Sequence, residues 1–260
     1  MVILITGIIV TAVAVFIRAP VQAYLDTTRR AELADEADTL LRRMTRDLRL
    51  ALPNSVRVVT IGASDRYVEF LLTSGGGRYR AEVTAAGTGN ILNFGAADSS
   101  FDVIGPVPAF AGGESIVVYN LGPGFAPADA YAAANNRAAF ASVAGSTVTL
   151  TAPKLFPFES PGKRFQVVQY PVTYGCVPNA ANPAAGTITR YWGYGFNAAQ
   201  VAPPSGGSSA IIAANVSNCA FSYDPNVLAL SNGLVTLSVS LTKGGETVTL
   251  FQEAHVSNVP

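Results

Sequence analysis

The sequence predicts an α+β protein in which one long N-terminal helix packs on a β-rich C-terminal head. Residues 1–17 are apolar and uncharged, and residues 18–52 place apolar side chains at every third or fourth position, as an amphipathic helix does. From residue 53 onward, β-branched and aromatic residues alternate with polar ones in short runs between turn-forming residues. We therefore expect a transmembrane helix segment over 1–17, an amphipathic helix over 18–52 that continues into the head, and a β-rich head over 53–260.

The composition argues against several classes of function. The 260 residues hold 17 Lys and Arg against 17 Asp and Glu, so the net charge is zero and the basic excess typical of phosphate binding is missing. We expect no nucleic-acid partner. One His and two Cys are too few for a zinc site, which uses about four nitrogen or sulfur ligands. We expect neither a metal site nor a cofactor.

The first element is the run from Met1 to Ile17, which contains no charged residue. A helix needs about 20 apolar residues to cross a bilayer, with about 17 as the lower limit. The run fits a signal peptide, a buried core helix or a membrane anchor. No basic residue precedes it as in a signal peptide, and the charged helix that follows favours the anchor. The apolar residues expected to form this membrane or filament helix are Val2, Ile3, Leu4, Ile5, Ile8, Ile9, Val13, Phe16 and Ile17.

The second element is the amphipathic helix, in which charged residues begin at Arg18. Pro53 and Asn54 are expected to end it. At about 1.5 Å per residue, a helix over residues 1–52 spans roughly 75 Å, more than twice the width of a small domain, so it should protrude from the head. The residues expected to pack on the head are Leu40, Leu41, Met44, Leu48 and Leu52.

The rest of the chain predicts strands and turns. The segment Lys243–Glu246 contains two glycines and predicts a hairpin between the last two strands. The Ala-rich segment Ala126–Ala141 could hold a short helix. The expected strands are Ser55–Ile61, Arg66–Leu72, Arg78–Thr84, Ser115–Asn120, Thr147–Thr151, Phe165–Tyr174, Thr187–Tyr194, Val216–Tyr223, Leu234–Thr242 and Thr247–Val256.

Cys176 and Cys219 are the only cysteines of the chain. An anchor followed by a head implies export, and cysteine pairs of exported proteins are usually oxidised. We therefore expect a disulfide, which the chain-entropy account values at roughly 3–4 kcal/mol. Two buried free thiols are the alternative.

Catalytic chemistry is mostly absent from the sequence. His255 is the only histidine and falls within the last expected strand, where a place on the strand face is far more typical than a catalytic role. The carboxylates beyond residue 53 are scattered and form no local constellation. Gly75–Gly77 is not followed by the helix that a phosphate-binding loop requires. We expect a protein that is not an enzyme.

Arg190, Tyr191, Trp192 and Tyr194 belong to the one dense aromatic cluster, which includes the only tryptophan. These side chains could fill the core and an edge strand. Because Tyr, Trp and Arg dominate binding hot spots, they are also a candidate partner patch.

A long helix that is apolar and then amphipathic, followed by a β-rich exported head, resembles type IV pilins and the pseudopilins of type II secretion. The segments Phe16–Tyr24, Leu41–Arg57 and Gly233–Pro260, together with Tyr191–Tyr194, look more specifically like the MshO-type minor pilins of mannose-sensitive haemagglutinin pilus biogenesis. The resemblance covers residues 1–57 and about the last hundred residues, whereas the middle of the chain matches loosely.

One departure from the family pattern concerns the start of the chain. The family's mature chains begin with a Phe-Thr-Leu-Ile-Glu-like stretch after a basic leader that ends in glycine. Met1 resembles the residue just after that glutamate. We therefore expect that the start codon is assigned too late or that the chain is trimmed, and that the native protein has a methylated N-terminal Phe.

The resemblance implies a non-enzymatic minor pilin that takes part in initiating or assembling a type IV pilus. Its implied partners are other minor and major pilins through the N-terminal helix, an inner-membrane assembly platform, and the lipid bilayer before assembly. The implied location is the inner membrane, in a single pass with the head in the periplasm, and the pilus tip or surface after assembly. The alternatives are a J-type minor pseudopilin of a type II secretion system and a membrane-anchored surface binding module or enzyme.

Overall fold

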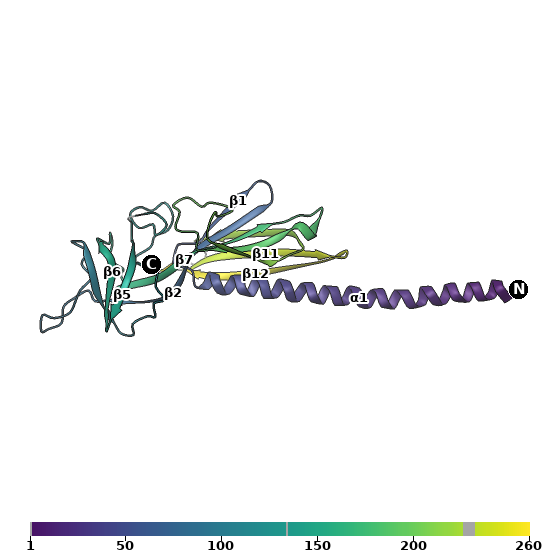
Figure 1. Cartoon of the computed structure of the whole chain (residues 1–260), viewed down its shortest axis with the longest axis horizontal. Coiled ribbons are helices and arrows are strands. Elements are labelled where there is room, and N and C mark those ends of the chain that lie inside the picture. Colours follow the sequence, from purple (N-terminus) through teal and green to yellow (C-terminus); the bar gives the residue numbers. More distant parts are fainter. Residues whose placement is uncertain (1, 134, 226–231) are drawn as a thin grey trace.

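The computed structural model describes residues 2–133, 135–225 and 232–260. One helix, α1 (Val2–Arg49), extends from an elongated β-rich head, and its first residues lie at the far end from that head (Figure 1). The C-terminus lies within the head, beside the strands. Side chains of several residues in the first half of α1, among them Ile3, Leu4, Ile8, Ile9 and Ile17, lie outside the described part.

Twelve strands and one single-turn helix follow α1 in the described ranges. The short helix η1 (Pro183–Ala185) lies between the seventh and eighth strands. The strands are β1 (Arg57–Ile61), β2 (Asp65–Tyr79), β3 (Asp98–Ile104), β4 (Ser115–Val117), β5 (Arg137–Ala144), β6 (Thr147–Lys154), β7 (Arg164–Val177), β8 (Thr187–Trp192), β9 (Ser208–Ala213), β10 (Val216–Asp224), β11 (Asn232–Lys243) and β12 (Glu246–Ser257).

The predicted α+β class, with a long membrane helix packed on the head, is wrong. The described residues form a mostly β structure with a nine-stranded and a three-stranded sheet. Strands β3, β5 and β9 occupy segments for which the sequence predicted no strand. Part of the helix expected over Ala126–Ala141 is instead the Ala-rich strand β5, which pairs with β4 and β6 on its two sides. These ladders override the weak helical preference of alanine.

The predicted transmembrane segment is also corrected. Over the described residues, α1 does not combine the length and the apolar content that crossing a bilayer requires. Its described positions include Thr6, Gly7 and Pro20 as well as charged residues from Asp26 onward.

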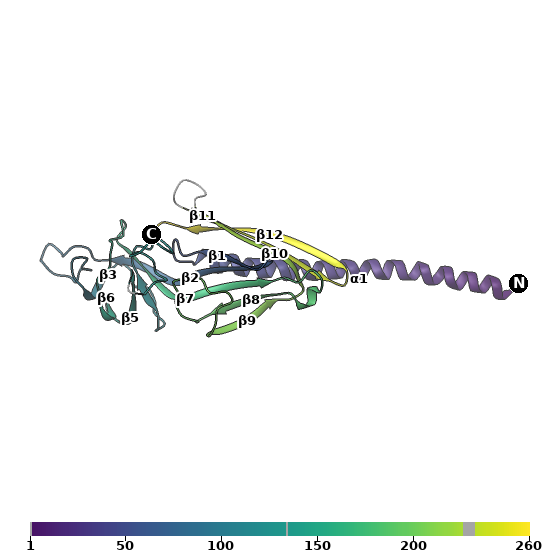
Figure 2. The ribbon, with the colours of Figure 1, turned by 90° about the horizontal axis from the view of Figure 1, so that it is seen from above.

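The large sheet combines an open part and a closed part. Strands β1, β2, β7, β8 and β9 lie side by side in the half of the head nearer to α1. The far half is a ring, because β2 pairs with β3, and the pairing continues through β6, β5 and β4 to β7, which pairs again with β2. Figure 2 shows β2 and β7 running from one half into the other. Every strand of the ring contributes to its core, which includes Tyr79, Phe101, Ile116, Ala138, Val148 and Phe165.

The glycine run Gly75–Gly77 explains how β2 changes partners. The β2–β7 register is irregular between Leu72 and Gly75, where the open sheet meets the ring. A Cβ at Gly76 would lie 2.8 Å from the Phe165 carbonyl oxygen, and one at Gly77 would lie 2.9 Å from the Phe165 ring. The glycines therefore allow a close approach of two strands.

The hairpin predicted at Lys243–Glu246 is confirmed. Strands β11 and β12 pair antiparallel down to the facing residues Lys243 and Glu246. Gly244 and Gly245 form the turn with φ values of +60° and +86°, which glycine adopts without strain. This hairpin is the longest pairing in the small sheet, and it lies along α1 (Figure 1).

The disulfide between Cys176 and Cys219 is confirmed. It joins β7 of the large sheet to β10 of the small sheet, so it crosses the core that the two sheets share with α1. A disulfide is compatible with a periplasmic or extracellular location.

Candidate functional site

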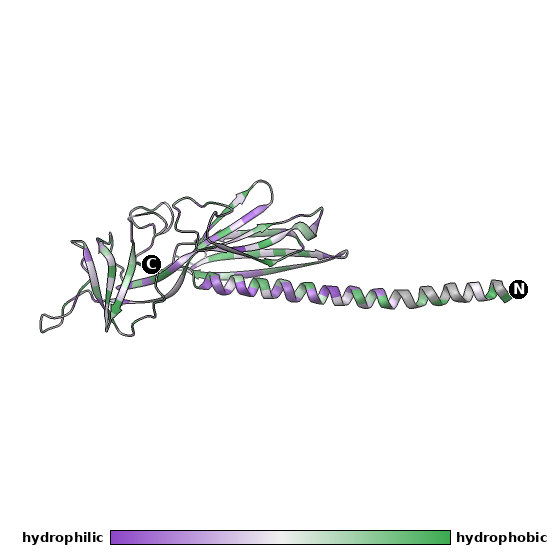
Figure 3. Cartoon of the chain, in the orientation of Figure 1, coloured by the Kyte–Doolittle hydropathy of each residue, from purple (hydrophilic) through white to green (hydrophobic). Residues whose placement is uncertain are grey.

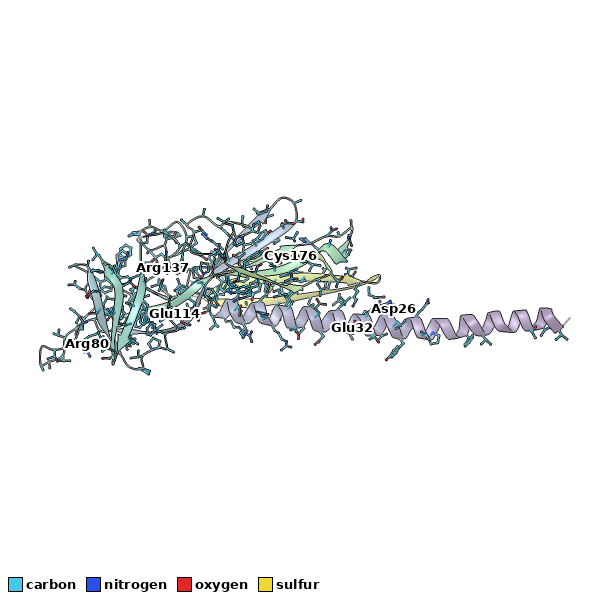
Figure 4. All side chains as sticks on the ribbon, in the orientation of Figure 1. Asp26, Glu32, Arg80, Glu114, Arg137 and Cys176 are labelled. Carbon is cyan, nitrogen blue, oxygen red and sulfur yellow. A yellow bond between two sulfur atoms is a disulfide. The ribbon has the colours of Figure 1, made fainter. Side chains whose placement is uncertain are left out.

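The tip of the β11–β12 hairpin marks where α1 leaves the head. Arg30 pairs with Glu246, and the Lys243 ammonium lies 3.7 Å from the Glu32 carboxylate. Figure 4 places Asp26 and Glu32 on α1 beside the hairpin tip. Residues 2–28 extend beyond this point, away from the head in both ribbon views. At about 1.5 Å per residue, this free half of α1 is roughly 40 Å long.

The free half of α1 exposes large apolar side chains. Phe16 is 83% exposed, Val2 is 75% exposed and Tyr24 is 72% exposed. Burying a side chain of this kind is favourable by about 1.5–3 kcal/mol, and a contiguous exposed apolar surface marks an interaction site. Further exposed large apolar residues, among the side chains that the structure describes in this segment, are Ile5, Val13, Val21 and Leu25.

The second half of α1 is buried against the sheets. Leu40, Leu41, Met44 and Leu48, which the sequence assigned to helix–head packing, are at most 3% exposed and lie in one cluster with residues of both sheets. Leu52 is also buried, but it lies beyond the end of α1 in a separate cluster with Leu71, Val117 and Tyr131. In Figure 3, hydrophilic and hydrophobic residues alternate along the half of α1 beside the head. The head therefore holds one half of the helix and leaves the other half free.

Polar contacts also hold α1 against the large sheet. The Tyr174 hydroxyl donates a hydrogen bond to the Asp47 carboxylate at 2.7 Å, and Arg190 Nε donates to the same oxygen at 3.1 Å. Burial, and next to it the Asp47 charge, raises the pKa of Tyr174, so its hydroxyl keeps its proton and remains a donor. The sequence reasoning missed Asp47, because its place on the polar side of the helix gives no sign of a buried partner.

The proposed partner patch is largely engaged inside the head. Arg190 is 9% exposed, and its guanidinium lies 5.1 Å from the Trp192 ring. The Tyr194 hydroxyl donates to Glu69 at 3.0 Å, while Tyr191 is half-buried on β8. These contacts bury Arg190 and leave Trp192 and Tyr194 half-buried, and none of the three is among the exposed large side chains.

A buried ion pair lies next to this patch. Arg57 Nε donates to Glu69 at 2.8 Å, and the side chains of the two residues are 10% and 1% exposed. The Arg57 guanidinium also lies 3.7 Å from the centre of the Tyr131 ring. Burial raises the pKa of Glu69, although Arg57 and Tyr194 oppose that shift. Arg57 and Glu69 therefore compensate each other's charge within the head.

His255 lies exposed on β12, on the face opposite to the buried Ala254 and Val256. Within the described ranges, no group of His, Cys, Asp or Glu is arranged to hold a metal ion. Among the surfaces of the described chain, the free half of α1 is the one on which apolar residues of a single element are concentrated. Searches of protein-family models, curated proteins and solved structures found no match to the chain.

Proposed function

We propose that the chain is a non-enzymatic, minor-pilin-like subunit that enters a filament by docking the free half of α1 among the helices of neighbouring subunits. The single observation that supports this proposal is the apolar surface that α1 exposes beyond its last contact with the head, at Val2, Ile5, Val13, Phe16, Val21, Tyr24 and Leu25. Packing this surface against other helices removes it from water, which is the main favourable term in such an association.

The head fits a role outside the cytoplasm in this proposal. The disulfide links the two sheets that hold α1, and such bonds persist in oxidising compartments such as the periplasm. Other minor and major pilins and an assembly platform are the partners that we propose. The head then distinguishes this subunit from its neighbours, while the helix supplies the common interface.

The test is to replace Phe16 by glutamate in the native host and to measure the amount of the chain in sheared surface filaments. A charge buried in an apolar helix interface is strongly unfavourable, so we expect incorporation to fall at least about tenfold. Thr39→Glu is the matched control, because Thr39 is exposed on the same helix but lies in the half that the head holds.

Both variants should keep the melting temperature of the head, since both side chains are exposed. Normal incorporation of the Phe16→Glu chain, or absence of the unaltered chain from filaments, would contradict the proposal.

A further inference from the structure

A basic groove lies beside the last turns of α1, in the half of the helix that packs on the head. It has a volume of about 650 Å³ and is lined by the last turns of α1 on one side and by β12 on the other. The residues that line it are Arg42, Thr45, Arg46, Arg49, Leu50 and Gln252. The three arginines follow a spacing of four and then three, which places them along one face of the helix over about 10 Å.

The charge of this groove is largely unneutralised. Arg42 pairs with Asp38, and the Arg42 side chain in that pair is 76% exposed. Arg46 and Arg49 are exposed, and no ion pair or hydrogen bond of their side chains is found among the described residues. No acidic residue lines the groove. Asp47, which follows Arg46, turns to Tyr174 and Arg190 on the sheet instead.

The helix dipole accounts for only part of this arrangement. Cations in the last turn of a helix stabilise it, which suits Arg46 and Arg49. Repulsion between like charges three or four positions apart opposes that gain. Stabilisation of the helix end alone therefore does not explain a row of three arginines. Binding of carboxylates does, because the planar guanidinium matches them in geometry and charge.

We propose that this groove binds an acidic segment of a different protein, with two or three carboxylates spaced over about 10 Å and an apolar residue against Leu50. Leu50 is 49% exposed and gives the groove an apolar part between the arginines and Gln252. A groove with an apolar part fits a single polypeptide segment better than it fits the flat surface of a membrane.

The acidic run of α1 in a second copy offers fewer free carboxylates than the groove calls for. Glu32 pairs with Lys243, Glu36 accepts a hydrogen bond from the Ala214 amide, and Asp38 pairs with Arg42. Among the described residues of that run, this leaves Asp35 as the exposed carboxylate without a partner, so a different protein with several free carboxylates is the better occupant. This inference does not rest on the docking of the free half of α1, since the groove lies at the other end of the helix.

The experiment measures binding of a short fluorescent peptide to the full chain by anisotropy. The peptide carries three glutamates over two helical turns and one leucine, and a peptide with glutamines in place of the glutamates is the control. We expect the acidic peptide to bind in a salt-dependent way, and Arg46→Glu with Arg49→Glu to weaken it at least about tenfold. Arg43→Glu is the matched variant, because Arg43 is exposed on the same helix but does not line the groove; it should weaken binding less than about twofold.

Three results would overturn the proposal. The first is no preference for the acidic over the glutamine peptide. The second is an equal loss for Arg43→Glu, which indicates general charge attraction. The third is stronger binding, with the same arginine dependence, to vesicles of phosphatidylglycerol and phosphatidylcholine, which indicates a lipid headgroup site. Unchanged melting of the variants shows that any loss of binding comes from the groove.

Discussion

Asp47 is the residue through which α1 is tied to the large sheet by hydrogen bonds. Its carboxylate accepts from Tyr174 and Arg190, and the Asp47 and Arg190 side chains are 13% and 10% exposed. Replacing Asp47 by alanine leaves a buried guanidinium without its charge partner, so we expect a loss of about 3 kcal/mol in the free energy of unfolding, measured by urea denaturation of the full chain.

The control for this change is Asp38→Ala on the same helix. Asp38 pairs with Arg42 where both side chains face water, so the expected loss is within about 0.5 kcal/mol. Equal losses for the two variants would show that the contact of Asp47 with the sheet contributes nothing beyond a surface ion pair.

Glu69 makes stability depend on pH in a defined direction. Burial raises the pKa of its carboxyl in the folded chain, with Arg57 and Tyr194 acting in the opposite sense. The folded state therefore binds the proton more tightly than the unfolded state. This contribution to stability is complete below about pH 4.3, the ordinary pKa of glutamate, and is lost as the pH rises through the folded pKa.

Glu69→Gln removes this titration while keeping the size of the side chain. We expect the stability of the unaltered chain relative to the variant to fall as the pH rises from about 4.3 toward neutrality, as measured by urea unfolding at a series of pH values. A difference that is constant with pH, or that grows with rising pH, would show that Arg57 outweighs burial.

Among the elements, β7 and β10 are linked by the one covalent contact between the sheets. Changing Cys176 and Cys219 together to serine removes the bond and places two hydroxyls in a buried core. The entropic account values the closed loop at roughly 3–4 kcal/mol, so we expect a loss of at least about that size. Reduction of the unaltered chain under denaturant should shift its urea midpoint in the same direction, and an unchanged midpoint would contradict this expectation.

Some strands can be predicted from the sequence and others cannot. The β11–β12 hairpin follows from two glycines between long alternating runs, and its register agrees with that pattern. Strands β5 and β9, by contrast, are rich in alanine and serine. Pairing of β5 with β4 and β6, and of β9 with β8, makes these segments strands. Local preference does not contain that information.

The candidate site is also only partly visible in the sequence. The apolar run to Ile17 is evident, but the exposed surface continues through Val21, Tyr24 and Leu25. This exposed surface ends where the tip of the β11–β12 hairpin contacts α1 near Glu32. That contact joins segments far apart in the sequence, so the sequence alone does not show it. The sequence left core filling and a partner patch open for Arg190 and Tyr194, because their partners Asp47 and Glu69 come from distant segments.

For the whole molecule, the division of α1 into a held and a free half predicts uneven local stability. An isolated helix is marginal in water, whereas a packed helix opens only with its tertiary contacts. We expect amides of residues 2–28 to exchange with deuterium much faster than those of residues 33–48 in the full chain by mass spectrometry. Equal protection of both segments in the monomer would show that the free half is stabilised without a partner.

The continuity of β2 and β7 has a mechanical consequence. Both strands run through the far ring and the open sheet, and β7 is joined by the disulfide to the small sheet that supports α1. When tension is applied between the ring and the helix, the paired strands are pulled along their own length. Many hydrogen bonds between the paired strands then bear the force together. The two halves of the head therefore resist extension as one body and do not separate at their junction.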